Sequence, residues 1–441
     1  MSVYNELKQK YSNVSYNSYS YTIENNKLNI NYNFEIENLC DFNPTWSIDI
    51  INDYNFDYNE LDSLVFSLGM VELLSYYKAV CSPNIIVKCH HLTNNQINWW
   101  KKLYINGLGE FLHINHIDSS KFDFNIKTIS DKQYIKSNNI NDSKSINVLV
   151  PIGGGKDSVV SIELLKKKFC PTAFIINPRQ ATLDTYTRSK LTSIILSKRV
   201  LDPKIKELND QGFLNGHTPF SAIVAFSSVI AAYINGLNYV ALSNEASASE
   251  STIIGTNINH QYSKSYEFES DFNYYNENYF NNSVKYFSLL RGFSELKIAS
   301  LFVLYPQYHD IFRSCNVGSF TDTWCSNCSK CLFVYIILSP FLTVEELYNI
   351  FNKNLLDDKQ LLEDFRKLIG LDDEKPFECV GAIDEINASI QFTINNYKLE
   401  LPYLLTYYND NYNGPQYNLN EIINKFNQEN DIPLDFIEVL K

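Results

Sequence analysis

The stretch Ile146-Asn-Val-Leu-Val-Pro-Ile-Gly-Gly-Gly-Lys-Asp-Ser158 decides the fold of this chain. Its aliphatic, partly β-branched start, bounded by polar sequence, predicts a buried strand of a parallel sheet. Three glycines follow, and Asp157–Lys168 then shows helical periodicity. Glycine allows close approach to the backbone, and the first turn of a helix offers free N–H groups and a positive dipole end. The sequence therefore predicts a strand–turn–helix unit that binds an anion.

The side chains of this turn add further binding groups. Lys156 contributes a positive charge, Ser158 a hydroxyl group, and Asp157 a carboxylate that can hold Mg²⁺ or cap the helix. The spacing differs from the Walker A pattern and from the dinucleotide fingerprint. It resembles the PP-loop of the adenine-nucleotide α-hydrolase superfamily, written Ser-Gly-Gly-x-Asp-Ser, with Gly153 in place of the first Ser. The resemblance implies cleavage of ATP between its α and β phosphates. The alternative is a tight turn without a ligand.

Strand and helix patterns alternate after this turn. Strands are predicted at Thr172–Asn177 and Tyr239–Ser243, and helices at Leu191–Val200 and Pro219–Tyr233. This alternation predicts an α/β fold with crossover helices, and the PP-loop resemblance implies a parallel-sheet core of the HUP type. We expect three regions. Residues 1–145 form an α+β domain that ends in a polar linker at 130–145, residues 146–340 the ATP-binding catalytic domain, and residues 341–441 a mostly helical region.

Composition narrows the class of protein. The 441 residues carry a net charge of −13, so a broad basic surface for nucleic acid is not expected. The longest apolar stretches are interrupted or too short to span a membrane, and the amino terminus lacks the pattern of a signal peptide. We expect a cytoplasmic protein with no nucleic-acid or membrane partner. The sequence carries no signal of its oligomeric state.

Four of the nine cysteines fall close together. Cys315, Cys325, Cys328 and Cys331 have the spacing Cys-x9-Cys-x2-Cys-x2-Cys, which favours metal binding over a disulfide framework. Zn²⁺ prefers such a tetrahedral set of thiolates. An iron–sulfur cluster is the alternative, but in ferredoxins the last such Cys usually precedes Pro, whereas Leu332 follows Cys331. A closed site with four Cys ligands predicts a structural zinc knuckle.

Longer motifs resemble the UDP-N-acetylmuramoyl-L-alanyl-L-glutamate epimerase family over nearly the whole chain. They include Gly107–Phe111, Gly212–Ala222, Ala241–Glu245, Asn259–Lys264, Glu267–Glu269, Tyr286–Arg291 and Lys375–Gly381. The resemblance implies that ATP drives inversion of the terminal L-Glu of a peptidoglycan precursor, a UDP-muramyl dipeptide, to D-Glu through an acyl-adenylate, with release of AMP and pyrophosphate. A PP-loop ligase similar to 7-cyano-7-deazaguanine synthase, acting on a nucleobase or protein end, is the alternative.

Such a reaction needs a nucleotide site, a cation and proton-transfer groups. We assign the triphosphate of ATP to residues of the turn and to the end of the second strand, namely Gly153, Gly154, Gly155, Lys156, Asp157, Ser158 and Asn177. Candidate Mg²⁺ ligands are Asp157 and Glu245, and candidate proton-transfer groups are His217, His260 and Lys264. Arg291 is a candidate clamp for the substrate γ-carboxylate or the UDP phosphates. For Cys379 we favour a buried structural thiol over an acid–base role.

Overall fold

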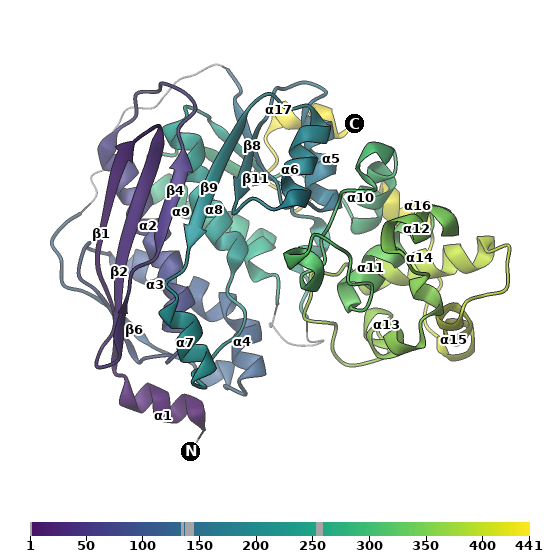
Figure 1. Cartoon of the computed structure of the whole chain (residues 1–441), viewed down its shortest axis with the longest axis horizontal. Helices are drawn as coiled ribbons and strands as arrows, with labels where there is room; N and C mark the ends of the chain where they lie inside the picture. The colour runs from purple at the N-terminus through teal and green to yellow at the C-terminus, as the bar shows by residue number, and fades with distance from the viewer. Residues whose placement is uncertain (1, 134–135, 137–144, 253–258) are drawn as a thin grey trace.

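Eleven strands form a single sheet in the part of the chain that this computed structural model describes, namely residues 2–133, 136, 145–252 and 259–441. The strands are β1 (Asn13–Glu24), β2 (Lys27–Ile36), β3 (Cys40–Phe42), β4 (Thr45–Asp49), β5 (Asn84–Val87), β6 (Asn125–Thr128), β7 (Val148–Pro151), β8 (Thr172–Ile176), β9 (Ile194–Val200), β10 (Tyr239–Leu242) and β11 (Lys285–Ser288). Their order is β11-β10-β7-β8-β9-β4-β2-β1-β5-β6, and β3 pairs with β2. Figure 1 shows the sheet as one twisted surface.

The five strands β11, β10, β7, β8 and β9 run parallel, which confirms the α/β class. The strands predicted around residues 146–150, 172–177 and 239–243 are β7, β8 and β10. The helix predicted at residues 191–200 is wrong, because Ile194–Val200 form β9. This strand pairs with β8 on one edge and with β4 on the other. Hydrogen-bonding partners on both edges stabilise an extended chain here, and they outweigh the local helical spacing.

The order of the strands reverses at β7. From β7 the chain proceeds to β8 and β9 on one side, and later to β10 and β11 on the other. A reversal of this kind leaves a crevice at the carboxyl ends of the strands, where ligands bind in open parallel sheets. The glycine turn follows β7 directly, and helix α5 (Lys156–Leu165) follows the turn, as the sequence predicts.

The amino-terminal strands extend this same sheet. β4 pairs antiparallel with β9, and β2, β1, β5 and β6 continue outward from it. Helix α2 (Tyr58–Tyr77) is buried along most of its length and packs on α8 (Phe220–Ile234). The sheet therefore crosses the predicted boundary at residue 145, and the division into three domains stays a prediction. Much of the predicted linker, residues 134–135 and 137–144, lies outside the described residues.

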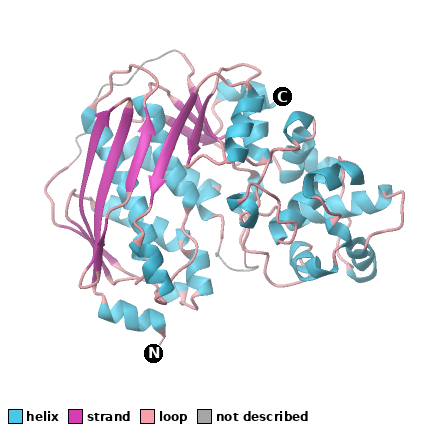
Figure 2. Cartoon of the chain, in the orientation of Figure 1, coloured by secondary structure: helices cyan, strands magenta, loops and turns pink. Residues whose placement is uncertain are grey.

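The other helices cover the sheet or form a carboxyl-terminal lobe, coloured green in Figure 1 and cyan in Figure 2. They are α1 (Val3–Lys10), α3 (Asn94–Gly107), α4 (Gly109–Ile114), α6 (Gln180–Ser189), α7 (Lys204–Asp210), α9 (Tyr266–Tyr279), α10 (Glu295–Phe302), α11 (Ser329–Leu338), α12 (Val344–Phe351), α13 (Leu362–Leu368), α14 (Ile383–Asn396), α15 (Tyr403–Asn411), α16 (Leu419–Asn424) and α17 (Leu434–Ile437). Phe436 of α17 returns to the sheet, where it contacts Tyr239 and Phe287. Within the described ranges, no helix is long and apolar enough to cross a bilayer.

A buried ion pair joins the amino-terminal half to the parallel strands. Arg199 of β9 donates two hydrogen bonds of 2.8 Å to the carboxylate of Glu72 on α2. Trp46 of β4 donates a third hydrogen bond, of 3.1 Å, to the same carboxylate. The Glu72 side chain has no exposed surface. Its charge is therefore compensated only by groups of the protein itself.

Replacing Arg199 with Met should lower the free energy of unfolding by about 3–5 kcal/mol, because the substitution leaves the Glu72 charge buried without its partner. Urea unfolding followed by circular dichroism measures the change. The control is Lys27→Met, which removes the exposed partner of Asp49 and should cost no more than about 1 kcal/mol. Equal losses in the two variants would contradict this account.

Candidate functional site

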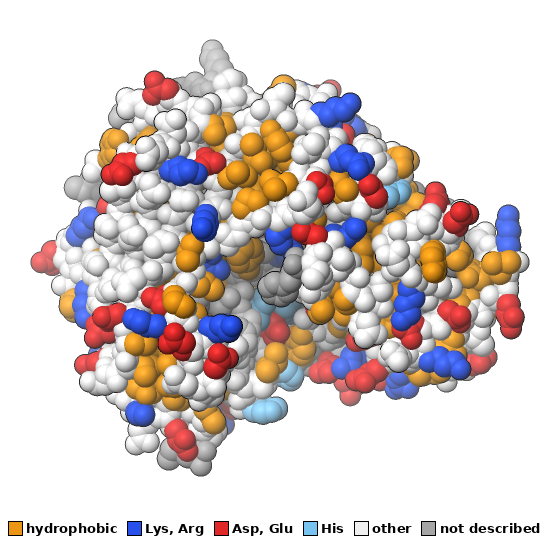
Figure 3. Space-filling model, viewed as in Figure 1, with side chains coloured by type: hydrophobic (Ala, Val, Ile, Leu, Met, Phe, Trp, Pro, Cys, Tyr) orange, Lys and Arg blue, Asp and Glu red, His pale blue; other side chains and the backbone are white. Residues whose placement is uncertain are grey.

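A pocket of about 530 Å³ lies at the carboxyl ends of β7, β8 and β10, where the strand order predicts a ligand. In Figure 3 the surface is hollowed between the two lobes, and histidine side chains gather beside this hollow. The lining includes predicted site residues from four separate stretches of chain, namely Gly153, Gly155, Asp157, Ser158, Asn177, Glu245 and Lys264. The structure thus brings most of the predicted site together.

The glycine turn forms one wall of this pocket. Gly154 has φ of 83°, a left-handed conformation that glycine adopts without a steric penalty, and its carbonyl accepts a 2.7 Å hydrogen bond from the Arg313 N–H. Gly155 precedes α5 and no side chain caps the helix. The first turn therefore retains N–H groups for a ligand. The Ser158 hydroxyl donates to the Gly155 carbonyl at 3.0 Å.

Two arginines that sequence reasoning did not assign to the ligand also line the pocket. Arg179 donates a 3.2 Å hydrogen bond to the Gly153 carbonyl. Arg313 is held by the carbonyls of Asp310, Phe312 and Asp322. With the start of α5, these guanidinium groups make this end of the pocket attractive to anions.

Lys156 is placed differently from the prediction. Its side chain is 3% exposed, lies away from the pocket lining and forms ion pairs with Asp157 and Glu295. Burial by itself lowers the pKa of Lys156, but the two carboxylates raise it above its ordinary value. Burial raises the pKa of Asp157, but the charge and hydrogen bond of Lys156 together with the charges of Lys330 and Lys264 outweigh burial and lower it. Lys156 therefore keeps the pocket-facing Asp157 ionised rather than reaching a ligand itself.

Asn177 and Glu245 lie at the ends of β8 and β10. The Asn177 amide bridges to β9, donating to the Arg199 carbonyl and accepting from the Arg199 N–H. Glu245 is 4% exposed and lines the pocket, as Asp157 does. Carboxylate oxygens of this kind suit a hard cation such as Mg²⁺.

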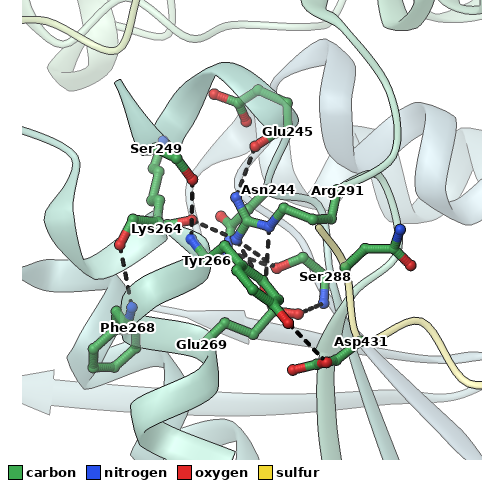
Figure 4. A network of polar contacts seen from close by, with 12 residues as sticks. Asn244, Glu245, Ser249, Lys264, Tyr266, Phe268, Glu269, Ser288, Arg291 and Asp431 are labelled. Atoms are coloured by element: carbon green, nitrogen blue, oxygen red, sulfur yellow. Dashed lines mark hydrogen bonds and ion pairs between the residues drawn. The ribbon is translucent and has the colours of Figure 1, made fainter. Parts of the chain in front are cut away.

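Arg291 lies inside the protein, at the centre of the network in Figure 4. Its guanidinium donates to the Glu269 carboxylate at 2.8 Å and to the backbone carbonyls of Glu245 and Lys264 at 2.7 and 2.5 Å. The side chain has no exposed surface and is absent from the pocket lining. The structure therefore gives Arg291 protein partners in the position where the sequence predicts a substrate clamp. The guanidinium of Arg291 therefore fixes the backbone at the two pocket residues Glu245 and Lys264.

The predicted proton-transfer groups form a cluster next to the pocket. Lys264 Nζ lies 3.2 Å from the Sγ atom of Cys379, and both side chains line the pocket. The His260 ring contacts Glu110 through Nδ1 and lies close enough to Cys379 to shift the pKa of its thiol. His217 lies behind it, with Nδ1 3.4 Å from the same Glu110 carboxylate. The two histidines do not line the pocket themselves.

The pKa values in this cluster diverge in a way that suits proton transfer. Burial lowers the pKa of His260, but hydrogen bonds to Cys379 and Glu110 outweigh burial and raise it to about 9. Burial and the nearby His260 charge lower the pKa of His217 to about 4. At neutral pH, His260 is therefore an imidazolium and His217 is neutral.

The four clustered cysteines also converge, near the start of α11. Their Sγ atoms lie within 4.8 Å of one another, with separations of 3.5, 3.6 and 3.9 Å in three of the pairs. A tetrahedral zinc site with bonds of about 2.3 Å requires sulfur separations of about 3.8 Å. The geometry therefore fits a four-coordinate metal. Cys315 also lines the pocket, so this cluster supports one of its walls.

Comparison with known proteins identifies the family. The MurL N-terminal domain model matches residues 5–289, and the MurL C-terminal domain model matches residues 311–414. The chain belongs to the MurL family. It is 35% identical over 343 residues to the UDP-N-acetyl-alpha-D-muramoyl-L-alanyl-L-glutamate epimerase of Salinispora tropica, covering 74% of this chain and 73% of that protein. It is 36% identical over 324 residues to the epimerase of the same name from Xanthomonas oryzae pv. oryzae, covering 71% and 70%. No solved structure matches the chain.

Both MurL domains contribute to the pocket. The N-terminal match contains the glycine turn, Glu245 and Lys264, and the C-terminal match contains the four cysteines and Cys379. Sequence reasoning missed Glu110 and gave Cys379 a structural role. Both residues lie in motifs that carry the family resemblance, Gly107–Phe111 and Lys375–Gly381. Those motifs were the available signal, but only the folded chain brings them to His260.

Replacing Arg291 with Lys should loosen the chain at Glu245 and Lys264, because an ammonium group cannot reproduce the forked contacts of a guanidinium. We expect a loss of about 1.5–3 kcal/mol in the free energy of unfolding, the value of hydrogen bonds to a charged group. Hydrogen exchange measured by mass spectrometry should be faster in both segments.

Arg188→Lys provides the matched control, because Arg188 pairs with Asp310 at an exposed site. The control should leave hydrogen exchange near the pocket unchanged. If exchange at Glu245 and Lys264 stayed at the native rate in Arg291→Lys, Arg291 would not hold these segments.

Proposed function

We propose that this protein catalyses ATP-dependent epimerisation of the terminal L-Glu of UDP-N-acetylmuramoyl-L-alanyl-L-glutamate to D-Glu, with release of AMP and pyrophosphate, in peptidoglycan precursor synthesis. Family membership supports the epimerase reaction and favours it over the PP-loop ligase. The observation that carries the ATP requirement is the joining of an anion-binding turn and a proton-transfer cluster in one pocket. A simple binding module would not need both.

Carboxylate activation explains why the two ends belong together. The α-proton of a glutamate residue is very weakly acidic, since its loss places negative charge beside an existing carboxylate. Transfer of AMP to the carboxylate removes that charge, and the electron pair left by the proton can then delocalise into the acyl carbonyl. Hydrolysis of the acyl-adenylate at the end releases D-Glu and AMP. The pocket therefore has to serve adenylation first and proton transfer second.

The nucleotide end consists of the PP-loop residues. Gly153, Gly155 and Ser158 line the pocket and would supply backbone and hydroxyl groups to the phosphates, while Gly154 forms the left-handed bend of the turn and Asn177 shapes the wall by joining β8 to β9. Asp157 and Glu245 would hold Mg²⁺, which offsets phosphate charge when bound. Lys156 keeps Asp157 ionised. Arg179 and Arg313 are suited to phosphate oxygens by their forked donors.

The other end supplies proton transfer through His217, His260 and Lys264. Lys264 faces the pocket. Burial lowers the pKa of Lys264, but the charges of the neighbouring thiolate and carboxylates outweigh burial and raise it, so the side chain remains an ammonium. Arg291 acts by positioning, because its contacts fix the chain at Glu245 and Lys264. The catalytic region 146–340 and the flanking regions 1–145 and 341–441 would then work as one unit around the pocket.

Incubation with ATP, Mg²⁺ and UDP-N-acetylmuramoyl-L-alanyl-L-glutamate in D₂O should place deuterium on the Glu α-carbon, yield D-Glu and form AMP. Asp157→Ala should lower AMP formation by more than about 100-fold, since it removes charge arranged for the transferring phosphate. Chiral chromatography and mass spectrometry provide the readouts. Asp210→Ala, an exposed substitution, serves as the control. AMP formation that required added ammonia or an amine would contradict epimerisation and favour the ligase.

We propose that Cys315, Cys325, Cys328 and Cys331 bind a structural Zn²⁺ that stabilises the pocket wall. Cys328→Ser should lower both the bound zinc, measured by atomic emission, and the melting temperature, because three thiolates hold zinc less tightly than four. Cys170→Ser replaces an exposed cysteine and should change neither. A native melting temperature in metal-free protein would exclude a structural role.

A further inference from the structure

We propose that the Cys379 thiolate is the catalytic group that meets the substrate α-proton on one face, with His260 and Glu110 as positioning residues. This proposal rests on the function proposed above and adds a residue to its machinery. It reverses the expectation of a structural thiol. Two observations carry it: Cys379 lines the pocket beside Lys264, and a carboxylate–imidazole–thiol chain lies behind it.

Position is the first argument. Cys379 lies between α13 and α14, and the pocket that contains it also contains Asp157 and Glu245 of the nucleotide end. Its backbone carbonyl accepts a hydrogen bond from Lys330. A substrate adenylated near Asp157 would therefore extend toward a thiol whose main chain is already fixed. His217 and His260 do not line the pocket, whereas Cys379 and Lys264 do.

The order of carboxylate, imidazole and thiol is the second argument. Glu110 orients the His260 ring through Nδ1, and the charge of that ring acts on the Cys379 thiol. A carboxylate that orients an imidazole beside a nucleophile or base is a recurring catalytic arrangement. Glu110 is 12% exposed and His260 is 9% exposed at the side chain, so water competes little with these contacts. The arrangement favours an ion pair of thiolate and imidazolium.

The charges around Cys379 agree with this geometry. Burial raises the pKa of its thiol, but Lys264, His260 and Lys330 outweigh burial and lower it to about 6. Asp157, Glu245, Glu378, Glu110 and His217 are the other titratable groups that face this cluster. Cys89 is a useful contrast: it is also half-buried, it lacks such a group of cations, and its pKa is raised to about 12.

The proposed step balances without an added oxidant or reductant. The Cα–H bond of the adenylated glutamate breaks, the proton forms an S–H bond with Cys379, and the electron pair moves into the acyl carbonyl as an enolate. A water molecule on the opposite face of Cα then gives up a proton, which restores the C–H bond with inverted configuration, and the hydroxide that remains takes the proton of the Cys379 thiol. In the reverse direction the neutral thiol donates the proton. A thiol fits this task because its pKa can lie near neutral pH, so that it can both accept and donate a proton.

The test separates adenylation from proton transfer in the full-length protein. Cys379→Ser and Cys379→Ala should lower both D-Glu formation and solvent deuterium incorporation at Cα by about 100-fold or more, the usual contribution of an acid–base group. ATP–pyrophosphate exchange that depends on the dipeptide substrate should remain within a few-fold of the native rate. Cys170→Ser should leave all three rates unchanged.

A positioning role for Glu110 has its own readout. In the native enzyme, activity should rise as Cys379 ionises near pH 6 and fall as His260 loses its proton near pH 9. Glu110→Gln removes a charge that holds the proton on His260, so the fall at high pH should move to lower pH. A purely structural role would lower the rate without moving the profile.

Alkylation of the native protein keeps the proposal testable even if the variants fold poorly. The rate of carbamidomethylation of Cys379 by iodoacetamide, followed by peptide mass spectrometry, should have its midpoint near pH 6 and slow when the substrate is bound. A midpoint near the ordinary thiol value, or native deuterium exchange in Cys379→Ala, would overturn the proposal. Loss of ATP–pyrophosphate exchange together with epimerisation would also overturn it. Absence of that exchange in the native enzyme would refute the proposed function instead.

Discussion

The guanidinium of Arg291 and the carboxylate of Glu269 form an ion pair with almost no exposed surface, and the candidate site depends on it. A buried charge is costly unless its hydrogen bonds are made, so Arg291 draws backbone carbonyls toward itself. These carbonyls belong to Glu245, a predicted Mg²⁺ ligand, and to Lys264, a predicted proton-transfer group. The buried Arg291 guanidinium thereby holds these two residues in a fixed position relative to each other.

Paired charges recur around the pocket and give each group a defined state. Lys156 keeps Asp157 ionised, Lys264 stabilises a thiolate at Cys379, and Glu110 keeps a proton on His260. Neighbouring charges thus separate the pKa values of groups that would otherwise have similar protonation states at neutral pH. This separation is what a reaction with both an anionic nucleotide and a labile C–H bond requires. Of the four clustered cysteines, Cys315 also lines this pocket.

The sequence predicted correctly those features that depend on residues close together along the chain. The strand–glycine–helix unit around Gly154 follows from apolar burial and backbone freedom, and the cysteine cluster follows from spacing alone. The prediction failed at Ile194–Val200, whose extended form depends on strands on both edges. Arg291 was placed at the substrate because an arginine in a motif suggests an anion. Arg291 does pair with an anion, but that anion is the Glu269 carboxylate of the protein itself.

By itself the sequence determined the α/β class, the position of the glycine turn after β7, the family resemblance and several pocket residues, because these follow from short periodic patterns and from longer motifs. Only the tertiary structure decided that Lys156 turns inward, that Arg291 is buried, and that Glu110, His260 and Cys379 lie in contact. The residues of the last group are separated by more than a hundred positions along the chain. Side-chain contacts over such distances arise from packing, and so do the charges that set each pKa.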